Sequence, residues 1–440
     1  MTEAMVRSWG RYPYHPQVAH PVEWRDQLGA TWQRVAAANG TTLAYGNGRS
    51  YGDSCLAAAD HVVHTRRLDR FIAANWQTGV VRAEAGASLD DVLQLAVPRG
   101  WMLPVTPGTK YATLGGAVAN DVHGKNHHVR GTFGRHVRRF ALLRSEREPL
   151  ECSPTENAEW FAATIGGLGL TGVIPWVEIQ LMPIRSSRIS VTSIRFDNLD
   201  EFFSLSEELD SQHEYSVAWV DCVSQGAALG RGIFMVGDHA EDGNLERPPG
   251  KKRTVPVTPP ISLINPLTLR AFNALYYNRQ QSKAVKSEVD YDGYFYPLDS
   301  LLEWHRIYGK RGFQQYQCVL PQANSRDGIH EILKAIGASG TGSFLAVLKR
   351  CGELASPGLL SFPMAGASLA LDFPQQDERN RRLFERLDAV VREAGGRLYP
   401  AKDAHMSASD FQRAYPAWRD LEALRDPALM SRFWQRTTQT

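Results

Sequence analysis

The sequence has little of what marks metal-binding, secreted or membrane-spanning proteins. Its 440 residues include five cysteines, and no two of them form a CxxC pair, so neither a zinc knuckle nor a disulfide framework is predicted. No apolar run approaches the roughly 20 residues that a membrane span needs. The first residues also lack the apolar core of a signal peptide. We therefore expect a cytoplasmic protein.

An excess of charge of either sign is also absent. The 49 lysines and arginines balance 47 aspartates and glutamates, which leaves a net charge of +2. Because there is no long basic block either, no nucleic-acid partner is predicted. Apolar residues make up 43% and charged residues 22% of the chain, as in folded globular proteins. A chain of this length exceeds one ordinary hydrophobic core, so we expect two domains.

Glycine, in contrast, is concentrated in three loops of residues 1–185. They are YGNGRSYGD at 45–53, PGTKYATLGG at 107–116 and GGLGLTG at 166–172. Such loops let backbone N–H groups approach a phosphate or a flat ring. One of them alone is as often a tight turn as a ligand loop. Three within one domain favour a long ligand that has phosphates at one end and a ring at the other.

The second loop runs into a stretch that joins small residues to titratable ones, LGGAVANDVHGKNHH at 114–128. Here His123 and Lys125 are candidates for contact with a reacting substrate. His127 and His128 beside Asp121 also suggest a metal site, but adjacent histidines on a turn diverge. We expect these two histidines to be structural and no metal to be bound.

Residues 186–396 differ from the first part, because strand-like runs alternate with helical patterns and no further phosphate loop occurs. Strands are predicted at 188–196, 215–223, 313–320, 343–349 and 367–373, and helices at 199–209, 328–336 and 383–394. The pattern predicts an antiparallel sheet that helices cover on one face, and therefore an α+β fold.

Residues 240–260 are rich in proline and basic residues, including RPPGKKR at 247–253, and predict a mobile loop. This loop could be a solvated excursion, a lid over the substrate, or a basic patch that faces anionic lipid.

The order of the motifs carries a resemblance. GNGRSYGD, PGTxxxTLGG, HGKNHH and GGxGLTGVI follow one another as in the FAD-binding domain of the vanillyl-alcohol-oxidase superfamily, the PCMH type. HGKNHH, and LYPAKD at 398–403, are more similar to the decaprenylphosphoryl-β-D-ribose 2′-oxidase family. The resemblance implies a FAD-binding domain at 1–185, completed by 397–440, and a substrate-binding domain at 186–396.

The resemblance also implies which residues bind FAD. In related oxidases that attach flavin covalently, a histidine often lies in the first loop. Arg49 takes that place here, so non-covalent FAD is expected, although His123 stays open as an attachment point. The implied FAD-binding residues are Gly46, Gly48, Arg49, Ser50, Tyr51, Gly52, Pro107, Gly108, Thr109, Thr113, Gly115, Gly116, Ala119, Asp121, Val122, His123, Gly169, Gly172, Val173 and Tyr399.

A further set of residues is implied at the substrate. A fixed cation such as Lys402 would stabilise the negative charge of reduced flavin, and Tyr51 or His123 would relay the hydroxyl proton. Gln315 and Gln317 share one face of a strand, because side chains repeat every two residues. The implied catalytic residues are Lys402, His123, Tyr51 and Tyr399, and the implied substrate-binding residues are Lys125, Trp219, Gln315, Gln317, Lys349 and Lys402.

The activity that the resemblance implies is oxidation of a secondary alcohol of a sugar, C2′ of polyprenylphosphoryl-β-D-ribose. A short-chain reductase partner would complete an epimerisation in cell wall biogenesis, with peripheral contact at the inner membrane face. Two alternatives stay open: a soluble alditol or aldonolactone oxidase that uses O₂, and a non-catalytic scaffold of a glycan-synthesis complex. The sequence departs from the family at Ala370, where mycobacterial-type enzymes carry a cysteine, and at Phe295 and Tyr296.

Overall fold

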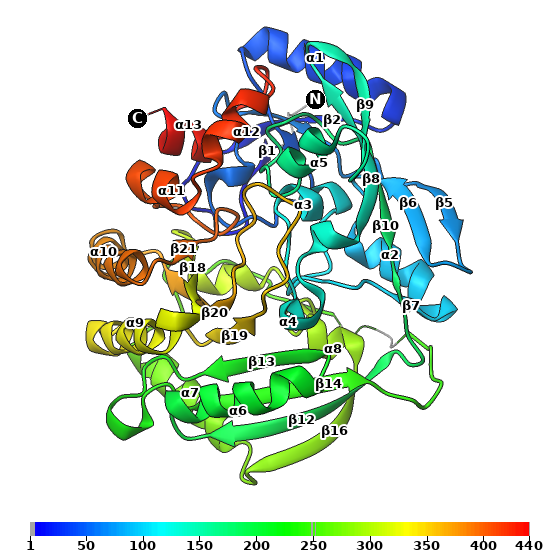
Figure 1. Ribbon diagram of the computed structural model, residues 1–440. Coiled ribbons are helices and arrows are strands. Elements are labelled where there is room, and N and C mark those ends of the chain that lie inside the picture. Colours follow the sequence, from blue (N-terminus) through cyan, green and yellow to red (C-terminus); the bar gives the residue numbers. More distant parts are fainter. Residues whose placement is uncertain (1–4, 248–249, 251, 440) are drawn as a thin grey trace.

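Three sheets form the framework of the molecule. The computed structural model describes residues 5–247, 250 and 252–439. Figure 1 shows the largest sheet at the bottom and the two smaller sheets above it. Each of the smaller sheets is built from the glycine-rich first part of the chain.

The first sheet is mixed, because β2 and β3 each pair in parallel with β4 whereas β1 pairs antiparallel with β2. Helix α1 (Leu28–Asn39) packs beside it through the buried Trp32 and Val35. In sheet order, the strands are β1 (Met5–Val6), β2 (Gln17–Pro21), β4 (His61–His64) and β3 (Ala44–Tyr45).

The second sheet is antiparallel and five-stranded. Ser88 caps helix α2 with the predicted capping box, in which the Asp91 carboxylate takes the place of the usual glutamate. In sheet order, the strands are β5 (Phe71–Asn75), β6 (Val80–Glu84), β10 (Trp176–Gln180), β8 (Val137–Arg144) and β9 (Arg147–Cys152). Its neighbours are α2 (Leu89–Ala96), α3 (Leu114–Ala119), α4 (His127–Arg130), α5 (Ala158–Thr164) and the short pair β7 (Trp101–Met102) and β11 (Met182–Pro183).

The third sheet has eight antiparallel strands. Its order is β16 (Ala284–Asp290), β12 (Arg188–Phe196), β14 (Gly232–His239), β13 (Tyr215–Val220), β19 (Val347–Cys351), β20 (Gly366–Pro374), β18 (Phe313–Pro321) and β21 (Arg397–Leu398). The predicted α+β class is confirmed. The sequence predicted that residues 397–440 complete the FAD-binding domain. In the structure, this segment begins with β21, which is the edge strand of the large sheet.

The large sheet has one apolar face and one polar face. On β18, Tyr316, Cys318 and Leu320 belong to the core. Gln315 and Gln317, which alternate with them, face a cavity. Because side chains alternate along a strand, each strand contributes to both faces. The helices α6 (Leu199–Leu209), α9 (Ser325–Ser339) and α10 (Asp377–Glu393) cover the apolar face.

Strands β14 and β16 and helix α7 (Pro266–Asn278) were not predicted. Strand β16 is an edge strand with almost every side chain exposed, so it lacks the apolar alternation from which a strand is recognised. Helix α7 packs on the cavity side of the sheet, where the Tyr276 ring lies 4.5 Å from the Trp219 ring. The short helix α8 (Tyr291–Phe295) follows β16.

Residues 240–260 are anchored at both ends. Ser187 N–H donates to the Asn244 carbonyl at 2.7 Å, and Arg247 pairs with Asp90 of α2 at 2.6 Å. Beyond them, β15 (Arg253–Thr254) pairs in parallel with β17 (Leu301–Leu302). Residues 248, 249 and 251 of the predicted mobile loop lie outside the described residues.

After β21 the chain returns to the first sheet (Figure 1). Leu429 forms a bridge with Thr42 and Ser431 with Ala57. The returning helices are α11 (Ala408–Ala414), α12 (Trp418–Leu424) and α13 (Arg432–Thr438). Nowhere in the described chain is a helix both long and apolar enough to cross a membrane.

Candidate active site

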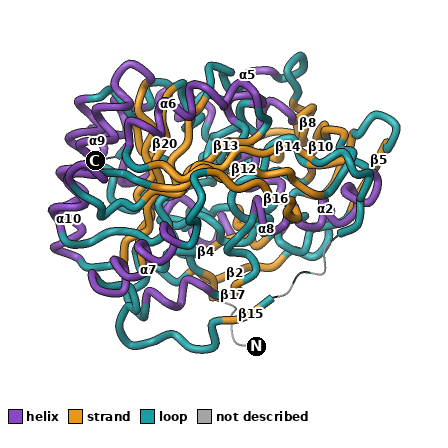
Figure 2. Tube along the Cα trace, turned by 90° about the horizontal axis from the view of Figure 1, so that it is seen from below, coloured by secondary structure: helices purple, strands orange, loops and turns teal. Residues whose placement is uncertain are grey.

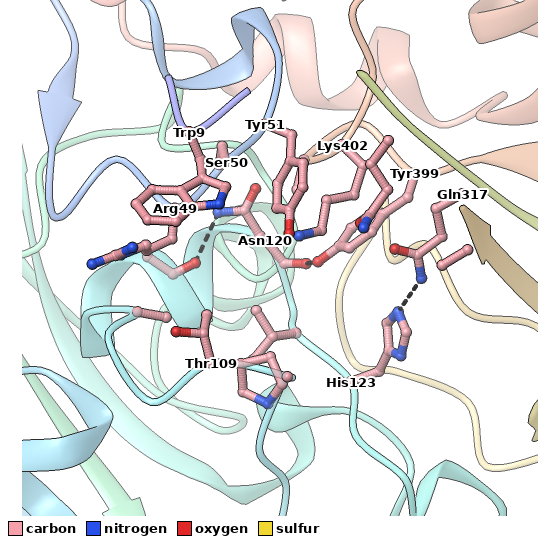
Figure 3. A pocket seen from close by; sticks show the side chains of 18 of the residues that line it. Trp9, Arg49, Ser50, Tyr51, Thr109, Asn120, His123, Gln317, Tyr399 and Lys402 are labelled. Atoms are coloured by element: carbon pink, nitrogen blue, oxygen red, sulfur yellow. Dashed lines mark hydrogen bonds between the residues drawn. The ribbon is translucent and has the colours of Figure 1, made fainter. Parts of the chain in front are cut away.

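A cavity of about 700 Å³ lies between the glycine loops and the polar face of the large sheet. Every residue that the sequence predicted for FAD or substrate lines this cavity, except Gly52, Asp121 and Val173. The two predicted groups therefore meet in one space, with the loops on one side and strands β13, β18, β19 and β20 on the other. Figure 3 shows this arrangement, with Lys402 beside Tyr51 and His123 beside Gln317.

The first loop presents free backbone donors. Gly48 has φ +58°, and a Cβ there would lie 1.9 Å from the Tyr45 hydroxyl oxygen, so only glycine fits. Among the described residues, the N–H groups of Asn47, Gly48 and Arg49 reach no acceptor. Successive N–H groups around a left-handed residue form a concavity that binds anions. This loop fits a diphosphate.

Arg49 adds a cation to the same loop. Its guanidinium lies 4.1 Å from the Trp9 ring centroid and 5.2 Å from that of Tyr111. Its Nε is buried and has no hydrogen-bond partner within the described chain. A buried donor without a partner costs free energy unless a ligand satisfies it. Arg49 therefore also fits the phosphates of FAD.

The second loop uses its glycines differently. Gly115 N–H donates to the Ala85 carbonyl and Leu114 N–H to the Ala87 carbonyl, both at 2.8 Å. Thr113 caps α3 by accepting from Gly116 N–H at 3.2 Å. Because these donors are occupied, α3 offers a flat surface of small residues rather than a phosphate site. That surface suits the ring of a flavin.

The third loop is held close to the second sheet. A Cβ at Gly172 would lie 2.5 Å from the Leu143 carbonyl oxygen, whereas Gly169 has no atom within 4 Å of the position of a Cβ. Gly172 thus permits close packing of the backbone, and Gly169 leaves open space at the cavity wall.

The three predicted residues that do not line the cavity support it from behind. A Cβ at Gly52 would lie 1.7 Å from the Asp403 carbonyl oxygen, so Gly52 allows the segment that carries Lys402 to approach. The Asp121 carboxylate accepts from Gly134 N–H at 2.8 Å and from the hydroxyls of two serines, Ser356 and Ser361, at 2.5 Å. It holds the turn before His123. Val173 is buried in one apolar cluster with Trp32 and Val35 of α1.

Lys402 and Asp372 both line the cavity. The Lys402 ammonium lies 3.7 Å from the Tyr51 ring centroid, and Gln315 donates to the Asp372 carboxylate at 2.6 Å. Burial raises the pKa of Asp372 and lowers the pKa of Lys402, while the attraction between the two opposes both shifts. Burial also raises the pKa of Tyr51 well above its usual value, so this phenol is neutral.

A second group of basic residues surrounds His123. The Lys349 ammonium lies 2.5 Å from His123 Nδ1 and donates to the Gly124 carbonyl at 2.7 Å. The Gln317 amide nitrogen lies 3.2 Å from His123 Nε2, so both ring nitrogens are engaged. Burial lowers the pKa of His123 well below its usual value and that of Lys349 to about 8.

Lys125 completes the cationic set. Its ammonium donates to the Tyr294 carbonyl and lies 4.3 Å from the Tyr294 ring centroid. Burial lowers the pKa of Lys125 to about 7, and the nearby Lys349 charge acts in the same direction. Phe295, one of the departures from the family, also lines the cavity, as does Ala370.

Tyr399, which was predicted to be catalytic, has its hydroxyl engaged. It donates to the Asn120 carbonyl at 2.9 Å, and its ring stacks on Phe362 with 4.5 Å between centroids. This side chain therefore shapes the wall beside α3. Trp219 donates from Nε1 to the Phe344 carbonyl at 2.9 Å and forms the opposite wall.

The two further histidines are hydrogen-bonded to backbone groups. His127 Nδ1 accepts from Gly352 N–H at 3.2 Å, and His128 Nε2 lies 3.0 Å from the His213 carbonyl oxygen. Over the described ranges, no group of three or more histidine, cysteine or acidic side chains could hold a metal ion.

Sequence reasoning missed many residues that line the cavity, among them Trp9, Tyr276, Asp299 and Asp372. Asp299 accepts from Lys110 N–H at 2.8 Å and from the Thr109 hydroxyl at 2.9 Å, so it positions the second loop. Asp372 did leave a signal, because an acid in the alternating strand 367–373 must face a polar environment.

Comparison with known proteins agrees with this geometry. The FAD binding domain family matches residues 16–153. The chain is 34% identical to decaprenylphosphoryl-β-D-ribose oxidase of Mycolicibacterium smegmatis over 94% of its own length and 92% of that protein. It is 32% identical to an uncharacterized protein of Streptomyces coelicolor, over 78% of this chain and 96% of that one. Mouse L-gulonolactone oxidase is 29% identical over 36% of this chain and 37% of its own.

The predicted family and the predicted FAD cofactor are thereby confirmed. The family match covers strands β2 to β9, and the similarity to the mycobacterial oxidase covers 94% of the chain, including most of the large sheet. The chain belongs to the decaprenylphosphoryl-β-D-ribose oxidase family of FAD-dependent oxidoreductases.

Proposed function

We propose that this protein oxidises the C2′ hydroxyl of a polyprenylphosphoryl-β-D-ribose to a ketone. One observation carries the proposal. Three lysines, Lys125, Lys349 and Lys402, line one cavity, and none of them has a carboxylate oxygen within 4 Å among the described residues. Such a group of basic side chains away from bulk water favours an anionic substrate, because the charge of the substrate would hold the lysines in their protonated form. A sugar that is linked to its lipid through a phosphodiester carries such a negative charge.

Different residues of the cavity are assigned to different parts of FAD. The free N–H groups at 47–49 and the Arg49 guanidinium would hold the diphosphate of FAD, and α3 with Gly169 would border its ring. Bound FAD supplies a hydride acceptor, which is the chemistry that oxidation of a carbinol requires. The cavity walls exclude water from the reacting atoms, because Lys349, His123 and Asp372 are all buried.

Lys402 is the residue that we assign to charge stabilisation. A fixed ammonium in a site of low dielectric constant stabilises negative charge that develops during the reaction. The lowered pKa of Lys402 also lets this amine exchange a proton near neutral pH. Gln315 and Gln317 are placed to hydrogen-bond sugar hydroxyls, and Lys349 and Lys125 to contact the substrate phosphate.

The proposal includes a second enzyme. Oxidation at C2′ removes the stereochemistry of that carbon, so a short-chain reductase that returns a hydride to the opposite face would complete an epimerisation. The test is anaerobic mixing of the FAD-loaded protein with a polyprenylphosphoryl-β-D-ribose, followed through the visible absorbance of the flavin. Rapid bleaching is expected.

The matched control substrate is the 2′-deoxy analogue, which keeps the lipid and the phosphate and should leave the flavin oxidised. Equal bleaching by free ribose or ribitol, with production of H₂O₂ in air, would instead indicate an alditol oxidase. Flavin that no sugar reduces would support the non-catalytic scaffold and refute the proposal.

A further inference from the structure

Helix α7 and the segment before it expose a row of large apolar side chains. Within 257–275 the exposed fractions are Val257 68%, Ile261 74%, Leu263 54%, Leu267 78% and Leu275 73%. We call these five residues the apolar ridge. Single exposed apolar residues are ordinary, but several large ones within one short segment indicate an interaction site.

The backbone beneath the ridge is fixed, so its side chains are held outward. Leu263 N–H donates to the Ile307 carbonyl at 2.9 Å, and Asn265 caps α7 with a capping box. The inner face of α7 is already buried through Leu269, Asn273 and Tyr277. Asn273 donates to the Asp221 carboxylate at 2.8 Å. The ridge therefore has no place left in the core to turn into.

The segment that carries the ridge has charged residues of one sign only. Residues 247–287 contain eight basic residues and no aspartate or glutamate. Of these, Lys252, Arg253, Arg270, Arg279 and Lys286 are exposed. Lys283 pairs with Glu201 at 2.5 Å and is not counted. An apolar surface that is flanked by cations is complementary to an anionic bilayer, which offers both acyl chains and phosphates.

The ridge adjoins an opening of the cavity. Phe272 and Val347 line the cavity and are also 41% and 37% exposed, so the cavity reaches the surface beside α7. Tyr276, one turn along α7 from Phe272, forms the cavity wall. Figure 2 shows β15, the loop that leads to α7, and α7 along one edge of the molecule.

We infer that the apolar ridge rests on an anionic lipid bilayer and places this opening of the cavity against the membrane surface. The bilayer contact stands on the exposed apolar side chains and the cations alone. That a lipid-linked substrate passes directly from the bilayer into the cavity rests, in addition, on the proposed function.

The test uses the FAD-loaded protein and vesicles of phosphatidylcholine with phosphatidylglycerol. The triple variant Ile261→Gln, Leu267→Gln and Leu275→Gln removes apolar contact but touches no residue that lines the cavity. We expect the wild type to sediment with the vesicles and the triple variant to partition at least tenfold more weakly, since each fully inserted side chain contributes appreciably to binding. The control variant Ile72→Gln, Val129→Gln and Leu354→Gln changes exposed apolar residues elsewhere and should bind like the wild type.

Charge gives a second measurement. Added salt should weaken binding of the wild type, and Arg270→Gln with Arg279→Gln should flatten that salt dependence. Wild-type protein that stays in the supernatant at low salt overturns the inference. A wild-type dimer that the triple variant converts to a monomer, without any binding to vesicles, also overturns it and assigns the ridge to self-association.

Failure of the proposed function would look different. A water-soluble substrate with a short prenyl chain should bleach the flavin of the wild type and the triple variant at the same rate. Vesicle binding without bleaching by either protein would retain the membrane surface and reject the substrate. Bleaching without vesicle binding would retain the proposed substrate and reject the membrane surface.

Discussion

Lys349 and His123, two basic side chains, are hydrogen-bonded to each other with 2.5 Å between Nζ and Nδ1. Burial and the Lys349 charge lower the pKa of His123 well below its usual value, so the imidazole is neutral and Nδ1 accepts from the ammonium. A neutral imidazole has one donor nitrogen and one acceptor nitrogen. Nε2 therefore carries the hydrogen. The Gln317 amide can accept it only when it is turned so that its oxygen, rather than the nitrogen now 3.2 Å from Nε2, faces the ring. The contact fixes the imidazole tautomer at the substrate side of the cavity.

The first prediction concerns Lys349→Met. Loss of the ammonium should raise the KM for the phosphate-linked sugar by about 10- to 100-fold, as expected for a charge-assisted hydrogen bond. The KM for a free sugar should hardly change. Lys310→Met, at an exposed position, is the matched control. Steady-state kinetics on both substrates measures the difference.

The same variant predicts a pH dependence. The pKa of Lys349 is lowered to about 8 by burial, so the wild type holds the ammonium below that pH and loses it above. The KM difference between variant and wild type should be large below about pH 7 and should vanish above about pH 9. A difference that persists at alkaline pH would show that Lys349 acts through its shape rather than its charge.

The second prediction concerns Lys402→Ala. The variant should keep its FAD, since we assign the phosphate contacts to residues 47–49. Its flavin should be reduced about 100- to 10,000-fold more slowly, the usual range for an acid–base or charge-stabilising group. Anaerobic stopped-flow mixing with substrate measures the rate, and the absorbance spectrum reports the flavin content. Reduction at the wild-type rate would remove Lys402 from the catalytic residues.

The third prediction concerns Asp372→Asn, which retains an oxygen that accepts from Gln315. The Asp372 carboxylate raises the pKa of Lys402. Without it, Lys402 should lose its proton at lower pH. The limb of the pH–rate profile for flavin reduction that belongs to Lys402 should therefore move toward acid by about one unit or more.

The control for this shift is Asp388→Asn. Asp388 accepts from the Tyr316 hydroxyl at 3.0 Å on the helix-covered face, away from the cavity. Its substitution should leave the profile in place. A profile that moves equally in both variants would point to a general loss of packing.

The glycine loops and the lysines of the site could be predicted from the sequence because each carries its signal locally. A glycine at φ +58°, such as Gly48, is required by its own backbone. Lys402 was found within a short motif. To predict that these residues line one cavity, it was enough to assume that the loops come together in one domain.

The partner of Lys402 could not be predicted in the same way. Gln315 and Asp372 are direct neighbours across strands β18 and β20, and alternation along a strand does not reveal which residue of another strand lies opposite. The role of Gly115 likewise depends on a contact with Ala85 in another segment. Strand β16 escaped prediction because, at the edge of the sheet, it has no buried face to leave a pattern.

The last prediction concerns the ion pairs that join the C-terminal helix to the first loop. Arg436 of α13 pairs with Asp53 at 2.7 Å and also with Asp403, which follows Lys402 in the chain. Both carboxylates are almost fully buried, with side-chain exposures of 4% and 1%. Arg436→Met would leave two buried carboxylates without this cation, at a cost of about 3–5 kcal/mol in the free energy of unfolding.

Arg432→Met on the same helix is the control, because Arg432 pairs with the half-exposed Asp60 and its loss should cost about 1 kcal/mol or less. Although burial opposes it, Arg436 lowers the pKa of Asp403, so this contribution to stability is present at neutral pH and is lost as the pH falls through the folded-state pKa. Denaturant unfolding of the two variants should differ most at neutral pH and converge in acid. Equal stabilities at neutral pH would mean that the returning helix is held by its apolar contacts alone.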